Sequence, residues 1–328
     1  MADSSLITQA KTLAQPSPKR KKEPHIYPEP FTVSPISQHT QTMLLLHGRG
    51  SNGEKFGLEF LSSKTAAGKS IQEHFPGMKF VFPTAKKRRA KWYNRAFISQ
   101  WFDNVPVDEQ SHGMSREEVD WQLEGLAETG EFLNPVLDDE VIAVGAKNVF
   151  IGGLSQGCAM GVHLLLSYQP TEGGENGNEG SLGGFIGMSG WLPFADDIQD
   201  LIPSGDKRET VGEEDDDDPF ATSGEEKDGF GLEPKCLQIS PAKQVCNFVR
   251  ENMELPPFEA IEPPCLQTPV FLGHGKSDEK VKTDLGLEVV MVLGKIGMQV
   301  RWEEYDVGHW YKVPEEIEDL IDFIKTSK

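Results

Sequence analysis

The feature that most constrains the fold is a short apolar segment that runs without a loop into a longer amphipathic one. Asn148–Leu154 has the composition of a strand buried on both faces, and Gln156–Tyr168 has the apolar spacing of a helix. Only Ser155 lies between them, in the sequence Gly-Leu-Ser-Gln-Gly. A strand that passes directly into a helix is typical of α/β proteins, in which helices cover a mostly parallel sheet.

The same alternation of strand and helix continues along the chain. Further apolar runs typical of buried strands are Thr42–His47, Lys79–Pro83, Gly184–Ser189, Pro269–His274 and Met298–Tyr305. The helices expected between and after them are Glu54–Leu61, Ser115–Val144, Val281–Ile296 and Val313–Lys325. This order predicts the α/β class, with a mostly parallel central sheet and helices on both faces.

Composition sets three segments apart from this pattern. Residues 1–38 contain six prolines and a Lys/Arg cluster, so we expect this N-terminal extension to be largely disordered. Residues 171–181 are rich in Gly, Glu and Asn, and residues 196–233 hold 15 acidic against 3 basic side chains. We expect both segments to be flexible insertions in a single domain that spans residues 39–328.

Charge and cysteine spacing limit the expected partners and cofactors. The net charge is −20, and an acidic chain repels the phosphate backbone, so we do not expect a nucleic-acid partner. No apolar run approaches the ~20 residues of a membrane span, and the first residues include no apolar signal segment. The four cysteines show neither CxxC nor metal-binding spacing. We therefore expect a cytoplasmic protein without metal or cofactor, and the cluster Lys19–Lys22 leaves nuclear import open.

Ser155 has the surroundings of a hydrolase nucleophile. Gly153 and Gly157 flank it where a sharp strand-to-helix turn brings backbones close together. A serine hydroxyl needs a neighbouring base, and the base needs a group that orients it. Of the eight histidines, His309 lies on the loop between the last expected strand and the last helix, from which it can reach the serine.

Two carboxylates compete for the third position. Asp278 follows the strand Pro269–His274, at the edge of the sheet where α/β active sites collect. Asp306 lies only three residues before His309 and is less able to meet the imidazole from the required side. We favour Asp278, because the order Ser155, Asp278, His309 is the one typical of α/β-hydrolases.

A hydrolase of this kind also needs N–H donors for the oxyanion that forms during acyl transfer. The backbone N–H of Gln156, directly after the serine, is one candidate donor. The other is the backbone N–H of Arg49, in the sequence His-Gly-Arg-Gly-Ser that follows the first core strand.

Taken in order, several motifs resemble the phospholipase/carboxylesterase family of α/β-hydrolases, and within it the acyl-protein thioesterases. They are Leu44–Gly50, Trp101–Asp103, Phe150–Gly157, Ser189–Pro193 and His274–Val281. The resemblance implies a serine hydrolase that cleaves carboxylic esters or thioesters through an acyl-enzyme, with S-acylated proteins, simple esters or lysophospholipids as substrates. It also implies that Trp101 lies beside an acyl channel and that Trp191 contacts the substrate.

The chain departs from that family next to the serine. Arg49 stands where the family usually has Leu, and Cys158 where it commonly has Gly. A cation at the mouth of the site favours an acidic acyl or protein group, so we expect these two residues to influence substrate preference. Two alternatives stay open. One is a small-ester carboxylesterase or lysophospholipase without a protein substrate, and the other is a non-catalytic binding protein that docks through the acidic insertion or the basic run 86–91.

Overall fold

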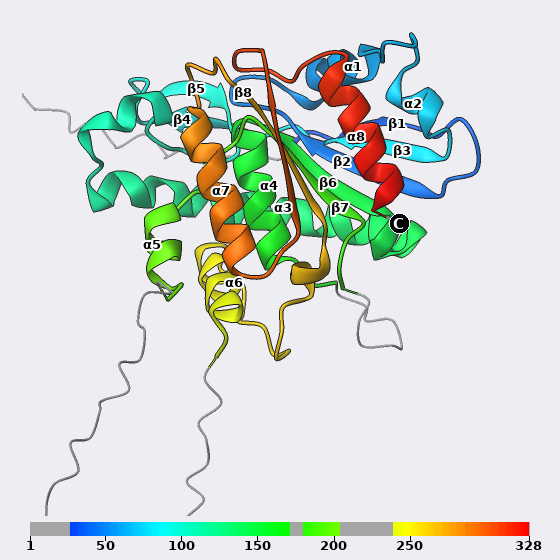
Figure 1. Ribbon diagram of the computed structural model, residues 1–328. Coiled ribbons are helices and arrows are strands. Elements are labelled where there is room, and N and C mark those ends of the chain that lie inside the picture. The colour runs from blue at the N-terminus through cyan, green and yellow to red at the C-terminus, as the bar shows by residue number, and fades with distance from the viewer. Residues whose placement is uncertain (1–26, 171–179, 204–238, 328) are drawn as a thin grey trace, which may run out of the picture.

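The structure is a computed structural model that describes residues 27–170, 180–203 and 239–327 (Figure 1). The strands of these residues are β1 (Phe31–Val33), β2 (Gln41–Leu46), β3 (Met78–Phe82), β4 (Lys87–Ala90), β5 (Ala96–Ser99), β6 (Val149–Leu154), β7 (Gly184–Met188), β8 (Val270–Gly275) and β9 (Val300–Tyr305). The helices are α1 (Gly53–Ser62), α2 (Ile71–His74), α3 (Arg116–Val144), α4 (Gln156–Ser167), α5 (Ala195–Asp200), α6 (Pro241–Asn252), α7 (Thr283–Lys295) and α8 (Glu315–Thr326).

In the described part of the chain, seven strands form one sheet in the order β1-β3-β2-β6-β7-β8-β9. All neighbours are parallel except β1, which pairs antiparallel with β3. The mostly parallel α/β sheet expected from the sequence is therefore confirmed. The carboxyl ends of parallel strands meet at one edge of a sheet, and the loops that follow β2, β6, β8 and β9 gather there.

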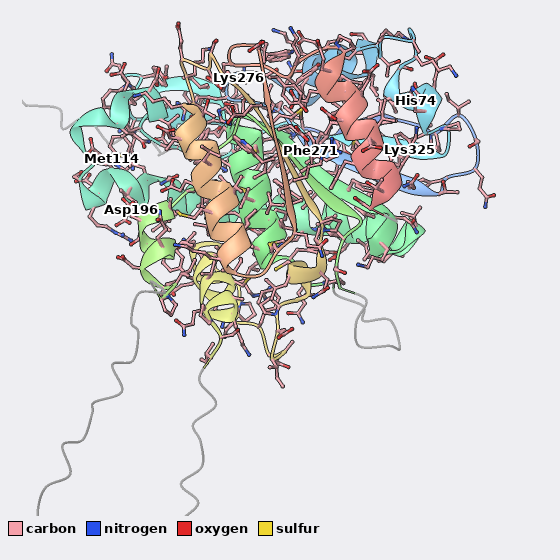
Figure 2. All side chains as sticks on the ribbon, viewed as in Figure 1. His74, Met114, Asp196, Phe271, Lys276 and Lys325 are labelled. Carbon is pink, nitrogen blue, oxygen red and sulfur yellow. The ribbon has the colours of Figure 1, made fainter. Side chains whose placement is uncertain are left out.

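Helices cover both faces of this sheet because its central strands are apolar on both sides. Along β2, Met43 and Leu45 pack into a core with α1 and α8, whereas Leu44 and Leu46 pack into a second core with α3, α4 and α7. Figure 1 shows α8 close to α1, and α7 beside α4. In Figure 2, Phe271 of β8 lies in the interior, and the charged side chain of Lys325 lies on the exposed surface of α8.

Two expected boundaries are corrected by the structure. Residues 31–33, inside the extension that we expected to be largely disordered, form β1 and pair with β3. Helix α5 occupies the start of the expected insertion 196–233, because Ile198 is fully buried in the core. Residues 204–233 of that insertion, most of 171–181, and the cluster Lys19–Lys22 lie outside the described residues.

Besides β1 and α5, four elements were absent from the sequence prediction: β4, β5, α2 and α6. Strands β4 and β5 form a hairpin that contains most of the basic run 86–91. Helix α6 packs on α4 through Val245 and Val249, and the short helix α2 packs near α8. None of the described helices has the length and apolar character needed to cross a bilayer.

Candidate active site

Ser155 occupies a sharp turn between β6 and α4. Its backbone has φ 57° and ψ −122°, a conformation rarely adopted by L-residues, and the Ser155 N–H donates to Met188 O at 2.9 Å. Gly157 is required here, because a Cβ at this position would lie 2.1 Å from Leu46 O. The close approach of β2 to the start of α4 therefore holds the serine at the carboxyl edge of the sheet, partly exposed.

His309 and Asp278 reach Ser155 from two other loops. His309 Nε2 lies 2.9 Å from Ser155 Oγ, and His309 Nδ1 lies 2.8 Å from Asp278 Oδ2. His309 comes from the loop after β9, and Asp278 from the loop after β8. The three side chains therefore form a continuous hydrogen-bonded series across 154 residues of sequence. This arrangement can pass a proton from the serine hydroxyl to the imidazole.

The Asp278 carboxylate is held in one orientation. Its Oδ1 accepts the backbone N–H groups of Lys280 and Val281, both at 2.9 Å, and its side chain is fully buried. Burial alone would raise the pKa of this carboxyl, but the hydrogen bonds from His309 and from these two N–H groups outweigh it and lower the pKa. Asp278 therefore stays ionised beside the imidazole.

The competing carboxylate, Asp306, lies outside this series. Its side chain is 89% exposed, and its nearest cation is Lys276, at 3.6 Å. Its position three residues before His309 places it on the solvent side of the loop, as the short separation along the chain suggested.

The loop after β2 passes directly over the serine. A Cβ on Gly48 would lie only 3.5 Å from Ser155 Cβ. Among the described residues, the backbone N–H groups of Arg49 and Gln156 have no hydrogen-bond acceptor. Both donors lie next to Ser155 and are free to bind an oxyanion, which is the role expected of them.

The Gln156 side chain joins this site to the segment 101–104. Its Oε1 accepts the Trp101 N–H at 3.1 Å, and its Nε2 donates to Phe102 O at 2.8 Å and to Asn104 Oδ1 at 3.0 Å. Gln156 is almost fully buried. Buried amides with this many partners are rigid, so the start of α4 and the segment 101–104 hold each other in place.

Trp101, which we expected beside an acyl channel, is not among the residues that line the cavity at Ser155. Its side chain is completely buried, and its Nε1–H donates to His47 O at 2.7 Å. A buried indole N–H needs such an acceptor, and the bond supports the loop that carries Arg49. His47 is itself buried, and burial lowers the pKa of its imidazole to about 4.

Cys158 does not face the substrate side either. It is buried in α4, and its Sγ packs so closely on Gly190 that a Cβ there would lie 2.3 Å away. Burial raises the pKa of its thiol to about 12, so it stays protonated. The expectation that Cys158 influences substrate preference is therefore not supported by its position.

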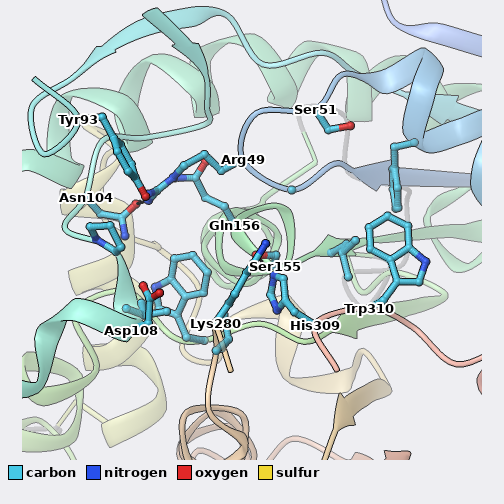
Figure 3. A pocket seen from close by; sticks show the side chains of 17 residues that line it. Arg49, Ser51, Tyr93, Asn104, Asp108, Ser155, Gln156, Lys280, His309 and Trp310 are labelled. Carbon is cyan, nitrogen blue, oxygen red and sulfur yellow. Dashed lines mark hydrogen bonds between the residues drawn. The ribbon is translucent and has the colours of Figure 1, made fainter. Parts of the chain in front are cut away.

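A cavity of about 390 Å³ opens in front of Ser155. Trp191 lines it as expected, together with the apolar side chains of Phe56, Leu154, Val281 and Trp310 (Figure 3). The lining also has polar members: Arg49, Ser51, Tyr93, Asn104, Asp108 and Lys280. Arg49 stood out in the sequence. Lys280 lies two residues after Asp278 and could have been found there, whereas Tyr93, Asn104 and Asp108 had no local signal.

Two further histidines, His274 and His163, are also buried. His274 Nε2 donates to Val281 O at 2.8 Å, and His163 lies inside α4, where burial lowers the pKa of its imidazole to about 3. In residues 27–170, 180–203 and 239–327, no three His, Cys, Asp or Glu side chains are grouped to hold a metal ion.

Comparison with known proteins agrees with this geometry. Residues 28–205 match the phospholipase/carboxylesterase family. Acyl-protein thioesterase 1 of Schizosaccharomyces pombe is 26% identical over 164 residues, which are 50% of this chain and 61% of that protein. Carboxylesterase SOBER1 of Arabidopsis thaliana is 27% identical over 181 residues, which are 52% of this chain and 64% of that protein. Each match spans less than two thirds of the relative's length.

The fold is also found among solved structures. The crystal structure of Zea mays acyl-protein thioesterase 2 superposes with a TM-score of 0.57 at 19% identity, covering 92% of this chain and 99% of that one. At this identity the likeness shows the α/β-hydrolase fold.

Proposed function

This chain belongs to the phospholipase/carboxylesterase family, and from that membership and the cavity geometry we propose that it is a serine hydrolase of esters or thioesters. The observation that carries the proposal is the unbroken series from Ser155 Oγ through His309 to Asp278, with distances of 2.9 and 2.8 Å. The series opens onto a cavity large enough for a small organic substrate.

The first half of the proposed reaction forms an acyl-enzyme. Ser155 Oγ attacks the carbonyl carbon while His309 Nε2 takes the hydroxyl proton, and Asp278 stabilises the imidazolium that results. The negative charge on the carbonyl oxygen is bound by the N–H groups of Arg49 and Gln156. His309 then gives the proton to the departing alcohol or thiol as its bond to the acyl carbon breaks.

The second half releases the acid. Water attacks the acyl-enzyme carbonyl while His309 accepts one of its protons, and the same two N–H groups bind the second oxyanion. Collapse of this intermediate breaks the bond to Ser155 Oγ, which regains a proton from His309. The products are a carboxylic acid and the free enzyme.

The names of relatives favour a thioester substrate over a simple ester. Acyl-protein thioesterase is the name of several relatives, whereas others are named carboxylesterases. We propose that an S-acylated protein is the substrate, with small esters as the second candidate. The apolar part of the cavity lining, which includes Trp191 and Phe56, supports an acyl group as the bound portion.

Labelling with a fluorophosphonate and turnover of p-nitrophenyl esters test the proposal. We expect wild-type protein to be labelled and Ser155→Ala to lose both labelling and turnover. Equal turnover by Ser155→Ala and wild type would refute the role of Ser155, and absence of labelling would favour a non-catalytic binding protein. A series of acyl thioesters and esters of increasing length then separates the two substrate classes, because cleavage of short esters alone would exclude the thioesterase role.

A further inference from the structure

The cavity in front of Ser155 is lined by two cationic side chains, Arg49 and Lys280. We propose that they form an anion subsite, and that the substrate is an ester or thioester carrying a carboxylate besides the bond that is cleaved. This inference rests on the proposed function and narrows its substrate class. The cavity in Figure 3 shows Arg49 and Lys280 on different sides of the space next to Ser155 and His309.

The Arg49 guanidinium is fixed in place but keeps unused donors. Its Nη2 donates to Asn104 Oδ1, and the guanidinium carbon lies 5.8 Å from the centre of the Tyr93 ring. Its Nε is buried and has no hydrogen-bond partner among the described residues. Because this N–H is inaccessible, a bound anion would contact the guanidinium through its other N–H groups. A carboxylate fits best, because a guanidinium presents its donors in the spacing of two carboxylate oxygens.

The backbone position of Lys280 is fixed by Asp278, which together with Ser155 and His309 forms the catalytic triad that we propose. Its backbone N–H donates to Asp278 Oδ1, so its position is set two residues after the carboxylate that orients His309. The side chain is exposed, and in Figure 3 it extends from the rim toward the middle of the cavity. An exposed ammonium on a flexible stem can follow a carboxylate over several positions, unlike the fixed guanidinium of Arg49.

Neither cation has a carboxylate within 4.0 Å among the described residues. Other cations of the chain do have such partners: Arg88 pairs with Glu128, Arg116 with Asp197, and Arg301 with Asp319. Other described cations, such as Arg95 and Lys243, also have no carboxylate partner in the described part of the chain. What sets Arg49 and Lys280 apart is that both line the cavity next to Ser155, where an anionic group of the substrate would lie between two cations.

Among the residues that the structure describes, Asp108 is the one carboxylate that lines the cavity, and it works against an anion. It is exposed and forms no ion pair with Arg49 or Lys280 within the described residues. The lining therefore has two cations against one carboxylate. Solvent screens the exposed Asp108 more than the partly buried Arg49, so the cationic contribution prevails close to Ser155.

Matched ester pairs test the subsite on either side of the cleaved bond. For the acyl side, we compare mono-p-nitrophenyl adipate with its methyl ester. For the leaving-group side, we compare the butyrate ester of 4-hydroxybenzoate with that of its methyl ester. The measured quantity is the ratio of kcat/KM for the anionic to the neutral member of each pair.

We expect this ratio to exceed about tenfold for at least one pair, which corresponds to about 1.4 kcal/mol of added transition-state binding. Lys280→Met and Arg49→Met should each lower the ratio several-fold, and raising the ionic strength from about 0.05 to 0.5 M should lower it in the wild type. Lys276→Met is the matched control, because Lys276 lies on the same loop but faces Asp306 outside the cavity. It should leave the ratio unchanged.

The subsite is refuted if the wild type prefers the neutral ester in both pairs, or if Lys280→Met and Lys276→Met give the same ratio. Thermal unfolding of each variant identifies any that fail to fold, and inhibition by monomethyl adipate, compared with dimethyl adipate, gives a second measure of anion binding in the wild type. Turnover that depends on Ser155 but shows no anionic preference overturns only the subsite. Turnover that is independent of Ser155 overturns the proposed function itself.

Discussion

Replacing Asp278 by Asn changes one atom of the triad and reverses the direction of one hydrogen bond. In the wild type, Oδ1 of Asp278 accepts the N–H groups of Lys280 and Val281, and Oδ2 accepts from His309 Nδ1. An Asn at this position keeps its carbonyl oxygen on the two backbone donors, since an amide nitrogen there would face them donor to donor. Its NH₂ group must then face His309 Nδ1.

That orientation forces His309 into the wrong tautomer. The amide donates to Nδ1, so the imidazole carries its proton on Nε2, which lies 2.9 Å from Ser155 Oγ. A protonated Nε2 cannot accept the serine proton. We expect kcat to fall by about 10⁴-fold, or about 5.5 kcal/mol, which is the loss seen when a triad carboxylate becomes an amide with unchanged geometry. Fluorophosphonate labelling should slow in parallel, because it needs the same proton transfer.

The assay is p-nitrophenyl butyrate hydrolysis, with thermal unfolding to show that the variant is folded. Asp306→Asn is the matched control, because Asp306 is exposed and is the other carboxylate near His309 in the sequence. It should retain at least about half of the wild-type kcat. A loss of less than tenfold in Asp278→Asn, or a large loss in Asp306→Asn, would show that the assignment of the orienting acid is wrong.

Two further predictions concern stability. Burial raises the pKa of the Glu316 carboxyl from 4.5 to about 8, so the folded chain keeps a proton that the unfolded chain loses between these values. The free energy of unfolding should therefore fall by about 1.4 kcal/mol for each unit of pH increase across that window. Urea titrations at several pH values measure this dependence. Glu316→Gln should make the free energy of unfolding less dependent on pH, whereas the control Glu315→Gln, at an exposed position, should leave the dependence unchanged. Trp101→Phe removes the hydrogen bond to the buried His47 carbonyl. This substitution should lower the free energy of unfolding, measured in urea, by about 1–3 kcal/mol, and it should lower kcat by displacing Arg49. An unchanged kcat would show that the hydrogen bond from Trp101 to His47 O does not position Arg49.

The predictable part of the fold was the part with strong local signals. The strands around Leu44 and Ile151 are mostly apolar because both of their faces are buried, and this pattern is visible in the sequence. The expected start of α3 at Ser115 coincides with a capping box, in which Ser115 Oγ accepts from the Glu118 N–H and the Glu118 carboxylate accepts from the Ser115 N–H. Strong helix and strand signals of this kind depend on few distant contacts.

The unpredicted elements depend on tertiary contacts. Strand β1 has only three residues and exists because Phe31 and Val33 pack at the sheet edge beside β3. Three of the four residues of β4 are basic, and the β4–β5 hairpin is held by ladder hydrogen bonds and by ion pairs such as that of Arg88 with Glu128. Such strands lack the apolar alternation that sequence analysis detects.

The residues of the candidate site likewise divide into those that local sequence signals predict and those that depend on tertiary contacts. Ser155, Asp278 and His309 were selected from chain order and from their positions at strand ends, and the structure brings them together. The buried position of Trp101 could not be predicted, because an aromatic residue next to a site has the same sequence signature whether it faces the substrate or the protein interior. Only the hydrogen bond to His47 O distinguishes the two.

Gln156 connects the two N–H groups that we propose bind the oxyanion. Its own N–H is one of them, and its side chain holds the segment 101–104, from which Trp101 supports the carbonyl of His47, two residues before Arg49. Substitutions at the two donor loops should therefore give energies that do not add. The loop after β2 and the start of α4 are not separable modules, and sequence changes in one require matching changes in the other. Attempts to graft a foreign loop at residues 47–51 should fail unless the partners of Gln156 are transferred with it.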